Sequence, residues 1–238
     1  MAAFPFLRAV AASLLVGLLG ACTSGAGAIV DTAFAVFGSS SKLDALQLNP
    51  QFRYLRVTIE GRPVFMALGY VDADANGPVE VWYSAEREVI RLRDGRLVGA
   101  TGLTREWRTV TLPTLPSWAS LAETKGPYRW TRRRDVMPGY RFGVVDELEL
   151  TRVERPDRSQ IRGVDPSSLA WFEERVLGGA GRFGGSTESV DIKLPVARYA
   201  VDMKVAEQPV VYAEQCVSVD VCFTWQRWSA AQQAQPAR

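Results

Sequence analysis

Hydrophobic and polar residues alternate with a period of two over most of the chain after residue 50. In residues 52–61 (FRYLRVTIEG), every second position from Leu55 to Ile59 is apolar. Side chains of a strand point alternately to its two faces, so this spacing predicts a half-buried strand. Similar stretches predict strands at 63–71, 79–84, 88–93, 96–101, 106–112, 128–133, 142–155, 197–204, 209–217 and 222–228. The pattern indicates a mainly β fold, with antiparallel strands in a sandwich or barrel-like arrangement and one or two short helices.

Turn-forming residues separate these strands. Residues 72–78 (DADANGP) are typical of a loop, and Asp94-Gly95 fits a two-residue type I′ hairpin, in which glycine adopts a positive φ without steric cost.

Two segments have helical spacing instead. Residues 167–177 carry an apolar stripe, follow the start signal Asp165-Pro166 and end before a glycine, which predicts a helix and then a loop at 178–185. Residues 28–37 (AIVDTAFAVF) predict a second, shorter helix.

The N-terminus has the features of a bacterial lipoprotein signal. Residues 9–20 form an uncharged apolar run that follows Arg8 and is shorter than the roughly 20 residues of a membrane span. The small residues Gly20 and Ala21 then precede Cys22. We expect cleavage before Cys22, which would carry diacylglycerol on its thiol and an acyl chain such as palmitate on its amine. A plain secretory signal or a buried free cysteine is the alternative.

The same signal predicts location and organisation. Thr23 follows the cysteine in place of the aspartate that commonly retains lipoproteins at the inner membrane, so we expect an outer-membrane lipoprotein that faces the periplasm. The predicted organisation is a signal peptide at 1–21, a lipidated tether with a short helix at 22–50, a β-rich domain of one or two subdomains at 51–229, and a frayed tail at 230–238.

Cys216 and Cys222 remain after lipidation. An oxidising periplasm favours a disulfide between them, closed by a chain reversal at Ser218–Asp220. Metal binding is the rival interpretation, although two thiolates in a chain without histidine make a poor metal site.

The absence of histidine narrows the chemistry. Without it the chain cannot form a Ser-His-Asp triad, a Cys-His pair or an HExxH zinc motif. The net charge of +2 argues against a general nucleic-acid binder, and we expect no cofactor and no metal.

Two further motifs are weak candidates for chemistry. Residues 146–149 (DELE) contain Glu147 and Glu149, which could serve a glycan hydrolase or lyase, but these share a strand face opposite Leu148, as on a solvated face. Residues 179–184 match G-x-G-x-x-G without the strand before and helix after that a nucleotide site needs, so a flexible loop is favoured.

Arginines and tryptophans offer a candidate surface. Nine arginines and six acidic residues lie between Arg129 and Arg162, a mildly basic stretch that could contact an acidic polysaccharide or lipid headgroups. The candidate residues for a glycan or partner surface are Arg132, Arg133, Arg134, Trp130, Trp225 and Trp228. A solvated strand face for the arginines and a core position for the tryptophans are the alternatives.

Five short motifs occur in order: GRP at 61–63, GYVD at 69–72, WYS at 82–84, RLRDGR at 91–96 and GL at 102–103. With them, residues 54–108 resemble the YjbF family of lipoproteins, which includes the group 4 capsule lipoproteins. The resemblance implies a β-rich outer-membrane lipoprotein that is an accessory factor in surface polysaccharide production. It supplies no catalytic residues.

Together these features predict a non-enzymatic lipoprotein that supports production or export of a capsular or extracellular polysaccharide. Its expected partners are the membrane, through the lipid, and polysaccharide-export proteins or an acidic polysaccharide. A carboxylate-based glycan hydrolase or lyase and a purely structural envelope lipoprotein are the alternatives.

Overall fold

The structure is a computed structural model, which describes residues 43, 46–183, 186–188, 194–207 and 209–229. The predicted helix at 28–37, the lipidation site Cys22 and the tail at 230–238 lie outside the described residues.

The described chain is mostly β-strand. Its strands are β1 (Tyr54–Ile59), β2 (Arg62–Asp72), β3 (Val79–Tyr83), β4 (Val89–Arg93), β5 (Arg96–Thr101), β6 (Glu106–Thr111), β7 (Tyr128–Met137), β8 (Arg141–Val153), β9 (Ala170–Phe183), β10 (Ser186–Glu188), β11 (Ala197–Val201), β12 (Val210–Cys216) and β13 (Cys222–Trp228). A helix, α4 (Trp118–Glu123), and a 3₁₀ turn, η1 (Pro166–Ser168), complete the described elements.

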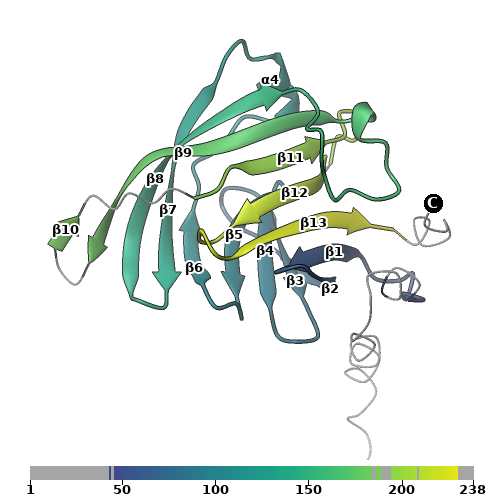
Figure 1. Cartoon of the computed structure of the whole chain (residues 1–238), viewed down its shortest axis with the longest axis horizontal. Coiled ribbons are helices and arrows are strands. Elements are labelled where there is room, and N and C mark those ends of the chain that lie inside the picture. Colours follow the sequence, from purple (N-terminus) through teal and green to yellow (C-terminus); the bar gives the residue numbers. More distant parts are fainter. Residues whose placement is uncertain (1–42, 44–45, 184–185, 189–193, 208, 230–238) are drawn as a thin grey trace, which may run out of the picture. The chain divides into compact units, whose positions relative to one another are not determined.

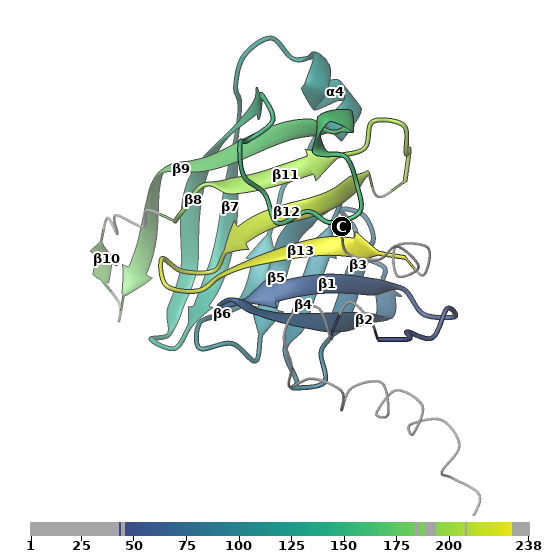
Figure 2. The ribbon, with the colours of Figure 1, turned by 45° about the vertical axis from the view of Figure 1, so that its right-hand side comes forward.

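Twelve of these strands form a closed antiparallel ring. Neighbours in sequence pair from β1 to β9, β11 follows on the far side of β9, and β13 returns to β1, while β10 pairs only with β9 (Figure 1). The ring closes because β9 pairs with both β8 and β11. Figure 2 shows β13 beside β1, so the first and the last strand of the ring are neighbours. The prediction of a mainly β, barrel-like fold is confirmed, and closure leaves the twelve strands without an unpaired edge.

Side chains that alternate along β7 and β8 place one face of each strand in the interior of the ring. On β8, Val144, Asp146 and Leu148 are buried, whereas Glu147 between them is exposed. β1 is different: Leu55 and Val57 are fully buried, but Tyr54 and Arg56 on its other face are buried as well, so the prediction of a half-buried strand is wrong there. The interior is apolar for the most part, but it also contains the charged positions described below.

The predicted Asp94-Gly95 hairpin is confirmed. Asp94 has φ 48° and Gly95 has φ 76°, the two positive values that a type I′ turn requires. A side chain at Gly95 would also meet Val210, because an added Cβ would lie 2.5 Å from its Cβ. The turn therefore connects β4 to β5 and packs against β12.

The predicted helix at 167–177 is wrong. Only η1 is helical, with the Asp165 side chain accepting a hydrogen bond of 2.9 Å from the Ser167 amide. From Ala170 the chain is the strand β9, which continues through most of the predicted loop at 178–185. Pairing with strands on both sides overrides a local apolar spacing that a helix could also have used.

The helix α4 is not among the helices predicted from the sequence. Ser117 caps it by accepting a hydrogen bond from the Ser120 amide at 3.2 Å. The helix places Trp118 against Phe172 and Tyr199, with ring centroids 5.1 Å away in each case. No helix among the described residues is long and apolar enough to cross a membrane.

Candidate functional site

Two arginines and an aspartate form an ionic cluster inside the ring. Arg132 and Arg134 occupy inward positions of β7, and Asp146 lies opposite Arg132 on β8. The Asp146 carboxylate accepts hydrogen bonds from Nε and Nη2 of Arg132 at 2.9 and 2.7 Å, and from the same atoms of Arg134 at 2.7 and 2.9 Å. Asp146 is completely buried, so its charge is neutralised by these arginines rather than by water.

The electrostatics of this cluster favour an ionised Asp146. Burial by itself would raise its pKa, but hydrogen bonds from Arg134 and the charges of Arg132 and Arg134 outweigh burial and lower the pKa below its ordinary value. Trp107 of β6 lies over both guanidiniums, 4.4 Å from Cζ of Arg132 and 4.9 Å from Cζ of Arg134. The carboxylate and the indole together hold two cations in a fixed position.

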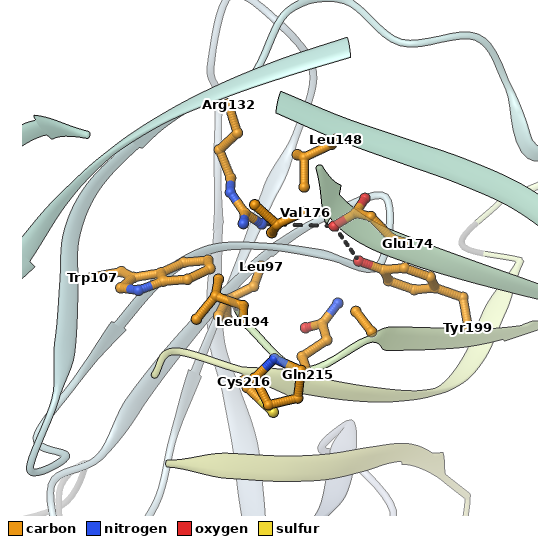
Figure 3. A pocket seen from close by; sticks show the side chains of 12 residues that line it. Leu97, Trp107, Arg132, Leu148, Glu174, Val176, Leu194, Tyr199, Gln215 and Cys216 are labelled. Carbon is orange, nitrogen blue, oxygen red and sulfur yellow. Dashed lines mark hydrogen bonds and ion pairs between the residues drawn. The ribbon is translucent and has the colours of Figure 1, made fainter. Parts of the chain in front are cut away.

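Glu174 of β9 lies next to this cluster but is less well paired. Nη1 of Arg132 is 3.7 Å from its Oε1, and the Tyr199 hydroxyl is 3.5 Å from the same oxygen (Figure 3). Its Oε2 has no hydrogen-bond partner among the described residues. Burial raises the pKa of Glu174, and the charges of Arg132 and Arg96 only partly oppose this effect.

A small cavity adjoins Glu174. Trp107, Glu174, Tyr199 and Gln215 contribute to its wall, and its volume is about 20 Å³ (Figure 3). A cavity of that size holds a single water molecule. The ionic cluster therefore has no room beside it for a sugar ring, and its geometry is that of a structural network inside the fold.

A larger hollow lies at the end of the ring where β1 begins and β13 ends. We call it the rim cleft; its wall includes Phe52, Arg53, Tyr54, Trp82, Arg227 and Trp228, and its volume is about 590 Å³. Tyr54 and Trp228 are paired in the β1–β13 register. The cleft therefore combines residues from opposite ends of the described chain.

A buried carboxylate lies beneath the two arginines of the rim cleft. Glu80 of β3 accepts from Nη2 of Arg53 at 2.7 Å, and from Nη1 and Nη2 of Arg227 at 3.1 and 2.8 Å. The Arg53 side chain nevertheless stays 47% exposed. Glu80 thus orients a guanidinium that solvent can still reach.

Aromatic side chains of the rim cleft pack together with Phe65, which is not part of the cleft wall. Phe52 lies 6.5 Å from Tyr54, Tyr54 lies 6.2 Å from Phe65, and Phe65 lies 5.8 Å from Trp228, measured between ring centroids. The indole nitrogens of Trp82 and Trp228 are buried and have no acceptor among the described residues. The cleft thus has an aromatic wall beside its two arginines.

Comparison with protein families gives a match over residues 43–183, more than half of the chain, to the family described as "Group 4 capsule polysaccharide lipoprotein gfcB, YjbF". The chain belongs to the YjbF family. Among solved structures, the hypothetical lipoprotein YmcC from Escherichia coli (K12) has a similar fold, with a TM-score of 0.55 and 14% identity over 77% of this chain and 90% of that one. A search of curated proteins gives no match. The resemblance seen in residues 54–108 is confirmed.

The YjbF match covers the ionic cluster completely and the rim cleft in part. Arg132, Asp146 and Glu174 lie within the matched residues, and so do Phe52 and the other cleft residues up to β3. The part of the cleft that β13 contributes lies beyond the match. The disulfide also lies there: Cys216 and Cys222 are bonded across the β12–β13 hairpin, as predicted, so these thiols are not metal ligands.

The predicted glycan or partner surface does not form as one surface in this YjbF member. Arg132 and Arg134 are buried in the ionic cluster, whereas Arg133 between them is exposed. Successive residues of a strand face opposite sides, so three consecutive arginines cannot share one face. Trp130 is buried on β7 beside them.

The two predicted tryptophans of β13 have different surroundings. Trp225 is fully buried, and its Nε1 donates to Gln215 at 3.4 Å. Trp228 belongs to the rim cleft. Contact with a glycan or partner protein stays a prediction, and among the six candidate residues the structure leaves Arg133 and Trp228 in positions that such a ligand could approach.

The structure also locates the two weaker motifs, the acidic stretch at 146–149 and the G-x-G-x-x-G match. Glu147 and Glu149 face outward, opposite the buried Leu148, as expected for a solvated face, and Glu149 is bound to Arg129 at 3.0 Å. Neither carboxylate lines the small cavity or the rim cleft. Gly179 of the G-x-G-x-x-G match lies within β9, so the expected flexible loop is wrong there.

The sequence carries a signal for the ionic cluster. Arg132 and Arg134 share their strand face with Trp130 and Val136, and Asp146 shares its face with Leu148. Charged residues on an otherwise apolar face indicate buried charge that needs a partner. The rim cleft had no comparable signal, because it joins segments far apart in sequence.

Proposed function

We propose that the protein is a non-catalytic lipoprotein that supports the production or export of a capsular or extracellular polysaccharide. Membership of the YjbF family, described as a group 4 capsule polysaccharide lipoprotein family, carries this proposal and supports a capsule-related role in the cell envelope. The finer parts of the proposal are an accessory role, an anchor at Cys22, and a position on the periplasmic face of the outer membrane.

The sequence around Cys22 supports the anchor. An apolar run that is too short to span a bilayer, two small residues and the cysteine follow one another in the order that lipoprotein processing requires. Growth with a radioactive fatty acid tests the anchor. The natural chain should be labelled and a Cys22→Ala variant should not; label retained by the variant would refute lipidation at this residue.

The chemistry of three buried carboxylates, Asp146, Glu80 and Glu174, supports a non-catalytic role. Asp146 and Glu80 are each held by two arginines, so both are fixed as charge partners. A general acid needs a carboxyl with a raised pKa and access to substrate. Glu174 has the raised pKa, but the adjoining cavity admits only one water. Incubation of the protein with the cell's own polysaccharide tests this point: the chain length should stay unchanged, and shortening would indicate a hydrolase or lyase.

Deletion of the gene tests the accessory role. We expect the quantity, chain length or attachment of the surface polysaccharide to change, and a plasmid copy of the gene to restore it. A Cys22→Ala copy separates the need for the anchor from the need for the domain. Polysaccharide that is unchanged in all three respects after deletion would refute the proposed function.

A further inference from the structure

The rim cleft has the dimensions of a ligand site. Its volume of about 590 Å³ falls within the range of roughly 300–1,000 Å³ that small-molecule sites occupy. Strand pairing fixes its wall, because Tyr54 of β1 and Trp228 of β13 are register partners. The site is therefore built on paired strands and does not depend on a loop alone.

The wall of the rim cleft is amphipathic. Phe52, Tyr54 and Trp228 supply aromatic rings, and Arg53 and Arg227 supply guanidinium groups. A sugar ring has the matching character, with an apolar C–H face that packs on aromatic rings and hydroxyl groups at its edge that accept hydrogen bonds from arginine. A lipid acyl chain has no polar groups along its length with which to contact either guanidinium.

The charge of the rim cleft is balanced. Arg53 and Arg227 are cationic, Glu80 beneath them is anionic, and Glu207 adds a carboxylate to the wall. A site for nucleic acid or for anionic lipid headgroups would carry an excess of positive charge. The balance suits a ligand that is recognised through hydroxyl groups with little or no net charge.

We propose that the rim cleft binds a saccharide unit of the surface polysaccharide, with Phe52 packed against the sugar ring and Arg53 donating to its oxygens. The identity of the polysaccharide rests on the proposed function, whereas the saccharide chemistry rests on the cleft itself. Glu80 keeps the Arg53 guanidinium in place before the ligand arrives, so little ordering is needed on binding.

Calorimetric titration tests the proposal. The probe is a mixture of short oligosaccharides released by partial hydrolysis from the surface polysaccharide of the source cells, and the protein is the full chain in phospholipid nanodiscs. We expect Phe52→Ala and Arg53→Gln each to weaken binding by about tenfold, which corresponds to about 1.4 kcal/mol. Arg227 still holds Glu80 in Arg53→Gln, so the fold should be retained.

Matched controls are available on the described surface. Tyr140→Ala removes an aromatic ring that is 72% exposed, and Arg105→Gln removes an exposed arginine; neither residue lines the rim cleft. Both controls should bind within about twofold of the natural chain. Absence of binding at millimolar oligosaccharide, or binding that the two cleft variants leave unchanged, would overturn the proposal.

The two proposals fail in different ways. If deletion of the gene alters the polysaccharide but the oligosaccharides do not bind, the saccharide site is refuted and the accessory role stands. If the oligosaccharides bind through the cleft but deletion leaves the polysaccharide unchanged, the accessory role is refuted and the binding site stands.

Discussion

Replacement of Asp146 by asparagine should strongly destabilise the protein. The substitution keeps the shape of the side chain but removes the charge that compensates Arg132 and Arg134. These three side chains are 0%, 7% and 2% exposed, so water cannot replace the lost partner. Removal of one member of a buried ion pair typically costs 3–5 kcal/mol, and here two buried arginines lose their shared acceptor. We expect a loss of about 4 kcal/mol in the free energy of unfolding.

Urea denaturation followed by tryptophan fluorescence measures this loss. With a slope of about 2 kcal/mol per molar urea, the midpoint should fall by about 2 M. Glu149→Gln is the matched control, because it removes a carboxylate from the same strand whose partner, Arg129, has a side chain that is 70% exposed. Such surface pairs contribute about 0–1 kcal/mol. Equal midpoint shifts for Asp146→Asn and Glu149→Gln would refute the role assigned to the buried cluster.

The pH dependence gives a second test of the same substitution. The pKa of Asp146 is lowered in the folded state from 3.8, so its contribution is complete above that value and is lost as pH falls through the lowered pKa. The stability difference between the natural chain and Asp146→Asn should therefore be largest at neutral pH and shrink in acid below about pH 4. A difference that grows on acidification would contradict the assignment.

Three other predictions follow from single contacts. The pKa of Glu174 is raised above 4.5 in the folded state, so the folded state binds more protons than the unfolded state and the natural chain should lose stability as pH rises above that value. Glu174→Gln should not show this loss. Melting temperatures of the two proteins that change in parallel between about pH 5 and 8 would contradict the prediction. Replacing Cys216 and Cys222 together by serine opens a loop with a sequence separation of 6, which should cost about 2 kcal/mol by urea denaturation, an effect that reductant should reproduce in the natural chain. Gly102→Ala should destabilise the protein more than Gly61→Ala. The two glycines have similar φ values, 82° and 78°, but of these two only at Gly102 would an added Cβ lie 2.6 Å from a backbone atom. Equal melting temperatures for the two variants would exclude that contact.

Local patterns predicted the strands well because each strand repeats one simple constraint. Positions 55, 57 and 59 of β1 share one face of the strand, and the Asp94-Gly95 turn needs only two residues with positive φ. The segment from Ala170 fits both the helical period and the strand period of two, since its apolar residues can line one side of a helix or alternate along a strand. Pairing with β8 and β11 decides between them, and those partners lie far away in sequence.

The candidate sites were harder to predict than the strands. Three consecutive arginines suggested a basic surface, yet the inward positions of Arg132 and Arg134 are tolerable only because Asp146 lies opposite them. The rim cleft depends on the pairing of Tyr54 with Trp228, a contact between residues at opposite ends of the β-rich domain. Neither arrangement follows from the spacing of residues along a single strand.

The sequence by itself determined the family, the β class, the positions of most strands, and the pairing of Cys216 with Cys222, because these depend on local order, on periodicity or on short separations. The tertiary structure decided which residues neutralise the buried charges and where a cleft exists. Closure of the ring joins β9 to β8 and brings β13 back to β1. The partner of each buried charge and the position of the cleft depend on residues brought together by that closure, so neither can be read from the order of residues along the chain.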